Sequence, residues 1–534
     1  MKQAVQSLRN PKTHKPLRTT AFATASIVTG LSVAERGLGF LYRIVLSHLL
    51  GGEGLGLYQV ALSVFAVFLT VGTGGIPITV SRLISKSKAE NNRRGESGAV
   101  SAGICVCLLL TLPVCLLFGI FPRLASFLFT DERGVAVFRI LLIGLCFSSL
   151  YAVFRGSFWG NQRFLLPSVL EIAEESVMVI AGILLLRNVQ NATQGANLAA
   201  WAVVISYVFS FTASLLCFLF CGGKLSHPQK QLKPLFNAAI PITSVRASGT
   251  LVNSAVAVLL PAMLMRTGYS QPEALRLFGV VSGMAMPVLF IPSTIIGSIS
   301  LVLVPKLSED FYRKNTRRLR QNLQRGLLAA LLISAFLIPF FHVLGKDLGL
   351  LAFSDALAGE FIQKGCLLLL PMSLTMISTA MLNSLGFEKQ TFLFYFIGAA
   401  AMLLCILFLP ALCGAYAYVL GLGASYILTA LCHLIFLGKK CPHLSPNFKK
   451  SRGYVWKQPV FKALILILPI SLIGGILHPL FCRIFGAVLS VLFSALCIAA
   501  VTVLIWYLSG ILPVKRLLSA YKSRRRAKRR TAVI

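Results

Sequence analysis

Long apolar segments recur along the whole chain, and they constrain its fold more than any other feature. Runs of about 18 to 25 apolar residues are each long enough to cross a hydrocarbon core about 30 Å thick. Of the 534 residues, 56% are hydrophobic and only 13% are charged, with a mean hydropathy of +0.81. This composition cannot supply the polar surface of a soluble protein of this length, so we expect an all-α polytopic membrane protein.

The apolar segments predict fourteen transmembrane helices. They span 22–46, 56–80, 98–121, 135–154, 166–186, 197–220, 235–264, 277–304, 327–344, 364–385, 391–412, 415–437, 461–480 and 484–512. Most of the 51 lysine and arginine residues fall in alternate gaps between these helices and at the two chain ends. Because the more basic side faces the cytoplasm, both termini are expected there. The net charge of +35 therefore orients the chain and contacts anionic membrane lipids, and nucleic acid is not an expected partner.

Cytoplasmic loops on either side of the chain's middle predict an internal repeat. "SRLISKSKAENNRRGESG" (81–98) and "PKLSEDFYRKNTRRLRQN" (305–322) align at one constant offset, and the loops 156–164 and 383–392 keep nearly the same offset. Helices 1–6 and 7–12 are therefore expected to be copies that form two six-helix lobes in parallel orientation, with a central cavity and alternating access. The expected domains are a basic cytoplasmic N-terminus (1–20), an N-lobe (21–221), a C-lobe (222–440), a linker with helices 13 and 14 (441–512) and a basic cytoplasmic tail (513–534).

No sequence pattern in the chain predicts catalysis, a cofactor or a metal site. The loops lack a glycine motif that cradles phosphates, and they lack an ATPase signature. Most of the 13 cysteines lie within apolar segments, where cysteine behaves as a small hydrophobe. We expect no enzyme activity, no cofactor and no metal, and we expect transport to use an ion gradient, the membrane potential or a substrate gradient.

Arginines within the predicted helices are the first candidates for a binding site, because such residues almost always face a bundle interior or a wet cavity. Arg36 and Arg43 are two turns apart, about 10 Å, and project from one face. Guanidinium is always charged and donates to two phosphate oxygens at once, so this pair suits a diphosphate. Arg246 in helix 7 is expected to approach from the other lobe. Alternatively, these arginines only pair with glutamates and hold the lobes together.

Glutamates gather on predicted helix 5. Glu171, Glu174 and Glu175 are spaced i, i+3 and i+4, which places them on one face. Carboxylates so close repel one another, which favours a neutral form of at least one and suits coupling to protons or sodium. The alternative is a static ion pair with an arginine such as Arg139.

Other charged residues are expected to have supporting roles. Glu35 lies about 100° round helix 1 from the arginine that follows it, so we expect it to face a neighbouring helix near Arg139 or Arg246. Arg155 and Arg163 are interpreted as ordinary flanking charges at the inner end of helix 4.

Glycines and prolines predict interruptions at comparable places in the two copies. Gly74, Gly75 and Pro77 predict a break in helix 2, and Pro287 and Pro292 predict one in helix 8. Matching interruptions point to gating segments, although packing kinks without function are the alternative.

Three segments carry a resemblance to a known family. "ERGLGFLYRIVLSHLLGGEGLGLYQ" (35–59), "GGIPITVSRLISK" (74–86) and "FGVVSGMAMPVLFIPSTIIGSISLVLVPKLSE" (278–309) resemble the polysaccharide-export and stage V sporulation protein B branch of the MOP flippase superfamily. This superfamily also holds the MATE drug exporters and the lipid II flippase. The resemblance covers about residues 20 to 440. It implies a MATE-like fold and translocation of undecaprenyl-diphosphate-linked glycans across the bacterial plasma membrane.

The resemblance is uneven at the residues that carry charge. Arg36 matches an arginine of helix 1 in the lipid II flippase family, and Arg43 lies one residue beyond a second. The charged residues that this family uses in helix 2 are missing, and Tyr58 stands there instead. This departure favours another lipid-linked saccharide or a sporulation-specific wall precursor over lipid II.

Three functions therefore remain open on the sequence. The first is a flippase for a lipid-linked oligosaccharide or cell-wall precursor. The second is an H⁺- or Na⁺-coupled MATE-type drug exporter, although the paired arginines would repel an organic cation. The third is a non-transporting scaffold that recruits glycosyltransferases or wall-synthesis enzymes.

Overall fold

The structure is a computed structural model that describes residues 18–440 and 457–511. Within these ranges the secondary structure is helical, and no strand is present. Twelve helical segments of the described chain are long and apolar enough to cross a membrane. The predicted all-α multi-pass membrane protein is therefore confirmed, whereas the count of fourteen spans stays a prediction. Most of the predicted basic N-terminus, the linker 441–456 and the basic tail lie outside the described residues.

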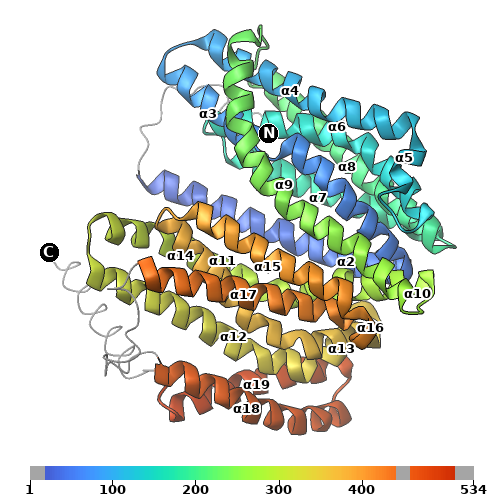
Figure 1. Ribbon diagram of the computed structural model, residues 1–534, viewed down its shortest axis with the longest axis vertical. Helices are drawn as coiled ribbons and strands as arrows, with labels where there is room; N and C mark the ends of the chain where they lie inside the picture. Colours follow the sequence, from blue (N-terminus) through green and yellow to red (C-terminus); the bar gives the residue numbers. More distant parts are fainter. Residues whose placement is uncertain (1–17, 441–456, 512–534) are drawn as a thin grey trace. The chain divides into compact units, whose positions relative to one another are not determined.

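The helices form two compact units. Figure 1 shows the helices with colours that follow the sequence from the N-terminus to the C-terminus. The first unit comprises residues 18–284 and 409–415. Its elements are α2 (Arg18–Thr73), α3 (Ile76–Ala89), α4 (Arg93–Ile120), α5 (Pro122–Ser126), α6 (Glu132–Gly160), α7 (Leu165–Leu185), η1 (Leu186–Asn188), α8 (Ala192–Phe220), α9 (Gln229–Arg266), α10 (Gln271–Phe278) and α16 (Pro410–Cys413). The π-helical turn η2 (Gly279–Ala285) follows α10. The predicted lobe boundary at residue 222 stays a prediction.

The second unit comprises residues 285–408, 416–440 and 457–511. Its elements are α11 (Met286–Tyr312), α12 (Thr316–Phe353), α13 (Ala356–Gly365), η3 (Cys366–Leu368), α14 (Leu369–Ser384), α15 (Glu388–Phe408), α17 (Tyr416–Lys440), α18 (Lys457–Ile484) and α19 (Ala487–Leu508). The appended pair α18 and α19 packs on α12 through an apolar cluster. His478 of α18 adds a polar contact, because its ring bonds Asp347 of α12 and Ser494 of α19.

Predicted helices 1 and 2 are joined in the 56-residue α2, and the residues between them are helical except at one point. Gly51 has φ 64° and ψ −177°, a conformation that is essentially restricted to glycine. The gap between predicted helices 1 and 2 is therefore much shorter than 47–55. A single glycine with non-helical dihedral angles separates the two helical halves.

Glycines beside this point also allow a very close helix crossing. A Cβ atom added at Gly56 would overlap the carbonyl oxygen of Leu275 in α10, and one added at Gly279 would overlap that of Gly52. Small residues four apart let two backbones approach closely in a membrane protein. The sequence "GGEGLG" (51–56) is thus explained by a bend and a backbone-to-backbone contact.

The predicted interruption at Gly74 and Gly75 is present in the first unit. Helix α2 ends at Thr73 and α3 begins at Ile76, with Pro77 in its first turn. The Gly75 N–H donates to the Thr243 hydroxyl of α9 at 3.0 Å. The broken backbone therefore gains a partner from another helix.

The comparable segment near α11 is arranged differently. Pro287 lies in the first turn of α11, directly after the π-helical turn η2, and Pro292 lies inside the helix. A π-helical turn is itself a local departure from the regular ladder and often occurs at functional sites. A gating role for either segment stays a prediction.

We predict that Gly56→Ala destabilises the protein by about 2 kcal/mol, because the added methyl group overpacks a backbone contact. Thermal unfolding of the purified protein in detergent, followed by tryptophan fluorescence, measures the change. Gly30→Ala is the matched control, since a Cβ atom there meets nothing within 4 Å and the residue lies in the same helix. Equal stability of the two variants would contradict the close crossing.

Candidate functional site

A small polar cavity lies among α2, α6, α7 and α8 in the first unit. Its volume is about 230 Å³. The residues that line it are Glu35 and Thr73 of α2, Ser148, Tyr151 and Arg155 of α6, Glu171, Glu174 and Glu175 of α7, and Tyr207 of α8, with Leu69 and Ala152 as apolar members. The structure thus brings together Glu35 and the glutamates of helix 5, which the sequence singled out separately. We call this space the acidic cavity.

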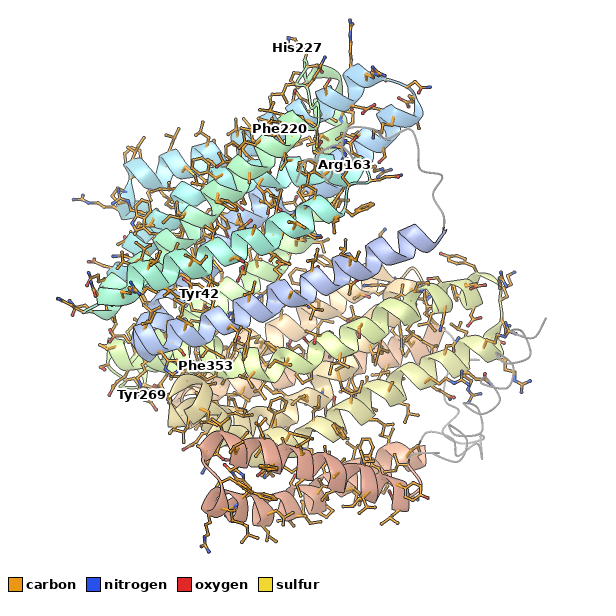
Figure 2. The ribbon with its side chains drawn as sticks, turned by 180° about the vertical axis from the view of Figure 1, so that it is seen from behind. Tyr42, Arg163, Phe220, His227, Tyr269 and Phe353 are labelled. Atoms are coloured by element: carbon orange, nitrogen blue, oxygen red, sulfur yellow. The ribbon has the colours of Figure 1, made fainter. Side chains whose placement is uncertain are left out.

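Two glycines set the fit between α2 and α7 at one side of the acidic cavity. A Cβ atom added at Gly39 of α2 would lie 2.8 Å from Oε1 of Glu175, so this carboxylate rests directly against the α2 backbone. In return, the buried Tyr42 ring fills the space beside Gly182 of α7. Figure 2 labels Tyr42 on α2. The glycines therefore allow α2 and α7 to interlock through one large side chain from each helix.

Arg155 is the cation of the acidic cavity. Its Nη1 donates to Oε1 of Glu171 at 3.0 Å, and both side chains are about three-quarters buried. Its guanidinium also lies 5.8 Å from the ring centroid of Tyr151 and 5.3 Å from that of Trp159. Cation–π contacts of this kind stabilise an arginine that has lost water.

The interpretation of Arg155 as a flanking charge is wrong. The helix continues to Gly160, beyond the predicted end at 154, so Arg155 lies within α6. The sequence held one signal that was missed. Tyr151 and Trp159 stand four residues before and four residues after Arg155, which places both aromatic rings on its face of the helix.

The charge and the size of the acidic cavity together favour a small cation. Four carboxylates face one guanidinium, so the lining is acidic overall. At about 30 Å³ for each water molecule, the volume holds roughly eight waters. This is room for a hydrated ion, and it is too small for a diphosphate carrying sugars.

Some polar atoms that line the acidic cavity lack partners. Within the described chain, the Tyr151 hydroxyl and Nε of Arg155 are buried without a hydrogen bond, and Tyr151 is only 5% exposed. Buried polar groups normally find partners. Water in the cavity would satisfy them, because it can accept from Nε–H of Arg155 and can bond the Tyr151 hydroxyl.

The other arginines of the predicted site lie outside the acidic cavity. Arg36, Arg43, Arg139 and Arg246 are all exposed. No ion pair among residues 18–440 and 457–511 involves any of them. Glu35, which was expected near Arg139 or Arg246, lines the acidic cavity with Arg155 instead.

Arg36 and Arg43 share one exposed face of α2. The residues before them in the chain, Glu35 and Tyr42, both point toward α7. Because successive residues are about 100° apart around a helix, Arg36 and Arg43 point about 100° away from that direction. The two guanidinium groups thus lie on a neighbouring face of the same helix that supplies Glu35 to the acidic cavity.

We predict that Arg155 and Glu171 are energetically coupled by about 1–2 kcal/mol, because removing either partner leaves the other charge largely buried. A double-mutant cycle of Arg155→Gln and Glu171→Gln, read by thermal unfolding in detergent, measures this coupling. The control cycle uses Glu360 and Lys364, which are 3.1 Å apart but exposed, and should give less than about 1 kcal/mol. Additive effects at Arg155 and Glu171 would show that the pair contributes nothing.

Known proteins share both sequence and fold with this chain. Stage V sporulation protein B of Bacillus subtilis (strain 168) is 23% identical over 384 residues, which is 67% of this chain and 74% of that protein. The lipid II flippase MurJ of the same organism is 24% identical over 474 residues, or 83% and 85% of the two chains.

Solved structures agree on the fold. The lipid II flippase MurJ in an inward closed conformation superposes with a TM-score of 0.70 at 16% identity, covering 91% of this chain and all of that one. An inward-facing MATE family multidrug transporter superposes with a TM-score of 0.65 at 13% identity, covering 78% and 96%. The expected MATE-like fold is therefore confirmed.

A family model described as "Polysaccharide biosynthesis protein" matches residues 22–311, which is more than half of the chain. The match contains α2 from residue 22 onward, the elements that follow it up to α10, and every residue that lines the acidic cavity. The chain thus belongs to the polysaccharide biosynthesis protein family, within the MOP flippase superfamily.

Proposed function

We propose that this protein flips a saccharide carried on a lipid diphosphate, such as an undecaprenyl-linked oligosaccharide or cell-wall precursor, across the bacterial plasma membrane by alternating access. It would act as a transporter and not as an enzyme, with both termini in the cytoplasm. The family supports this proposal, since its relatives include a protein named as a lipid II flippase and one named for sporulation.

The observation that carries the proposal is the pair of arginines on the exposed face of α2. If Arg36 and Arg43 served only to hold helices together, each would have a carboxylate partner. Glu171 pairs with Arg155 instead, and the described residues give the α2 arginines no ion pair. Two permanent positive charges about 10 Å apart within a membrane helix then favour an anionic ligand, and a diphosphate matches their fork-like donors.

Arg246 is proposed to add a third contact to the same diphosphate. It lies on α9, which packs against α2 in the first unit, and its side chain is exposed. It follows Thr243, the residue that binds Gly75 at the break between α2 and α3, by one helical turn. Movement of this break would therefore also affect the helix that bears Arg246.

The acidic cavity is proposed to bind the coupling cation, H⁺ or Na⁺. Because four carboxylates face one guanidinium there, binding of a proton or sodium ion relieves repulsion among Glu35, Glu174 and Glu175. Arg155 neutralises only Glu171. A nearby cation site and an anion-binding helix face on the same α2 would allow one helix to respond to both ligands.

Tyr58 argues against lipid II itself as the substrate. The lipid II flippase family is expected to use charged residues in helix 2, and here Tyr58 is buried at 5% exposure. A different saccharide or a sporulation-specific precursor fits this departure better. Glycosyltransferases or wall-synthesis enzymes that make such a precursor are the proposed partners.

A cation-coupled drug exporter is the second candidate. The acidic cavity would bind the proton or sodium ion that drives export of an organic cation, and the fold is shared with a MATE family transporter. The exposed arginines disfavour it, since they repel an organic cation. A non-transporting scaffold has no use for either charged site.

We predict that Arg36→Gln and Arg43→Gln each lower flipping at least tenfold, because each loses a charge-assisted bidentate contact worth about 1.5–3 kcal/mol. Complementation of a strain that lacks the gene, with membrane abundance measured by immunoblot, tests this. Arg187→Gln, which removes an exposed arginine of η1, is the control and should complement fully. Full activity of Arg36→Gln at normal abundance would overturn the proposed role.

We predict that Glu174→Gln removes the dependence of transport on a proton or sodium gradient, because a neutral amide cannot gain or lose charge. Transport is measured in vesicles with each gradient imposed in turn. Glu132→Gln, at the exposed start of α6, is the control and should keep the wild-type gradient dependence. If the wild type gives drug resistance that the Glu174 variant lacks, and the wild type flips no lipid, the exporter is the better explanation.

A further inference from the structure

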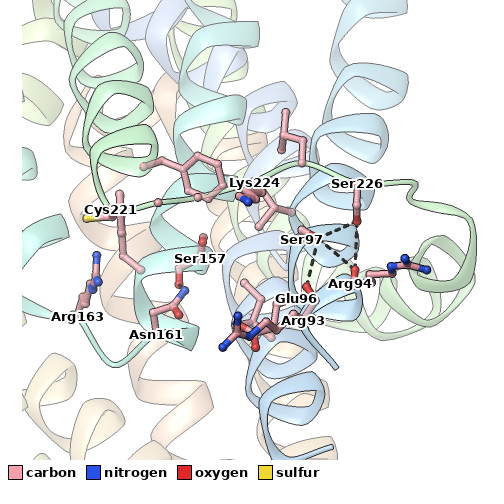
Figure 3. Close-up of a pocket in the computed structure, with 17 residues that line it drawn as sticks. Arg93, Arg94, Glu96, Ser97, Ser157, Asn161, Arg163, Cys221, Lys224 and Ser226 are labelled. Atoms are coloured by element: carbon pink, nitrogen blue, oxygen red, sulfur yellow. Dashed lines mark hydrogen bonds between the residues drawn. The ribbon is translucent and has the colours of Figure 1, made fainter. Parts of the chain in front are cut away.

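A second and larger cavity lies at one end of the first unit, where three connections between helices meet (Figure 3). Its volume is about 590 Å³. It is bordered by the start of α4, the end of α6 with the turn that follows it, and the segment that follows α8. We call it the basic pocket, because four cations line it: Arg93, Arg94, Arg163 and Lys224.

The walls of the basic pocket are fixed by defined helix ends. Asn91, Gln162 and Gly222 have φ values of 53°, 59° and 77°, so the second residue of each connection lies in the left-handed region. Each of these residues donates its N–H back to the helix that it ends. Such caps fix the direction in which the chain leaves a helix.

Hydrogen bonds tie the segment after α8 to α4. The Ser97 hydroxyl donates to Oγ of Ser226 at 2.8 Å, and the Ser226 hydroxyl donates to the Arg94 carbonyl oxygen at 3.1 Å. The Ser226 N–H donates to Oγ of Ser101 at 3.1 Å. Figure 3 shows Ser97 and Ser226 joined at one side of the basic pocket. The pocket is therefore preformed and does not depend on a ligand to assemble it.

The charge of the basic pocket is unbalanced. Glu96 is the single acid among its lining residues, against four cations. Across the part of the chain that the structure describes, none of these cations takes part in an ion pair. The first turn of α4 adds the partial positive charge of a helix N-terminus, although Asn92 already caps the Gly95 N–H. Unpaired cations around a cavity of this size favour a multivalent anion.

Apolar side chains at the rim indicate where such an anion comes from. Leu225 lines the basic pocket and is 59% exposed, and Phe220 and Phe164, which adjoin lining residues in the chain, are 86% and 45% exposed. Figure 2 shows Arg163, Phe220 and His227 at the same end of the first unit. A cationic cavity next to exposed apolar groups matches an anionic lipid, with its phosphate inside and its acyl chains against the rim.

We propose that the basic pocket is a binding site for a phosphate-bearing anion, in the first place the headgroup of an anionic phospholipid. It lies at the end that the basic loops place in the cytoplasm, and its lining shares no residue with the acidic cavity. The site does not depend on the proposed flippase function, since it would bind its ligand whether or not a saccharide is transported.

The test uses the full chain purified in a neutral detergent. Phosphatidylglycerol, phosphatidylcholine and sodium pyrophosphate are titrated separately, and the midpoint of thermal unfolding is followed, because a ligand of the folded state raises it. The variant is Arg93→Gln/Arg163→Gln/Lys224→Gln. Its matched control is Arg317→Gln/Arg318→Gln/Arg320→Gln, which removes as many cations from the start of α12 in the second unit.

We expect phosphatidylglycerol to stabilise the wild type and the control at the same concentration, and the pocket variant to need at least tenfold more. Phosphatidylcholine should have no effect, because its headgroup is neutral overall. A response to phosphatidylglycerol alone identifies a lipid headgroup, and an equal response to pyrophosphate identifies the phosphate group itself.

An unchanged response of the pocket variant, or no response of the wild type to either anion, would overturn the proposal. If the triple variant is not monodisperse on size exclusion, Lys224→Gln alone serves, since this side chain is exposed on a loop. It should weaken the response about threefold, and no weakening would count against the site.

Discussion

An ionised side chain in hydrocarbon costs several kcal/mol unless it has a partner or water, and the first unit is arranged around this constraint. The charge of Arg155 is stabilised by the Glu171 carboxylate at 3.0 Å and by two aromatic rings. The other glutamates avoid this cost because they share a small polar cavity. This arrangement needs α2 and α7 to approach closely, which Gly39 and Gly182 permit. Small residues in membrane helices therefore place the charges as much as the charged residues themselves do.

Three regions of the first unit each carry an excess of one sign of charge. Carboxylates dominate the acidic cavity, the α2 arginines occupy an exposed face, and further cations surround the basic pocket. Helix α6 links two of these regions, because Arg155 lines the acidic cavity and Ser157 lines the basic pocket. Gly156 between them packs against the Pro77 backbone of α3. A shift of α3 at the Gly74–Gly75 break would therefore displace α6 and change the lining of both cavities.

Much of the fold could be predicted from the sequence, because apolar length and glycine placement act locally. The helices and the break before Ile76 follow from such local signals. The clustering of Glu171, Glu174 and Glu175 follows from helical spacing. The helical geometry of residues 47–55 on either side of Gly51 could not be predicted, since it accompanies the packing of Gly52 and Gly56 against α10. The role of Arg155 depends on how far α6 extends, and the basic pocket depends on three loops meeting in space, which no single segment of sequence reveals.

The central claim is that α2 presents its unpaired arginines to a lipid-linked diphosphate. Reconstitution of the purified protein into liposomes with a fluorescent prenyl-diphosphate disaccharide tests it most directly, with accessibility of the dye to an external quencher as the readout. The predicted result is protein-dependent movement of the labelled lipid between leaflets that excess unlabelled lipid diphosphate inhibits and that ethidium does not. Movement of ethidium without movement of the labelled lipid, by protein that remains folded, would contradict the claim.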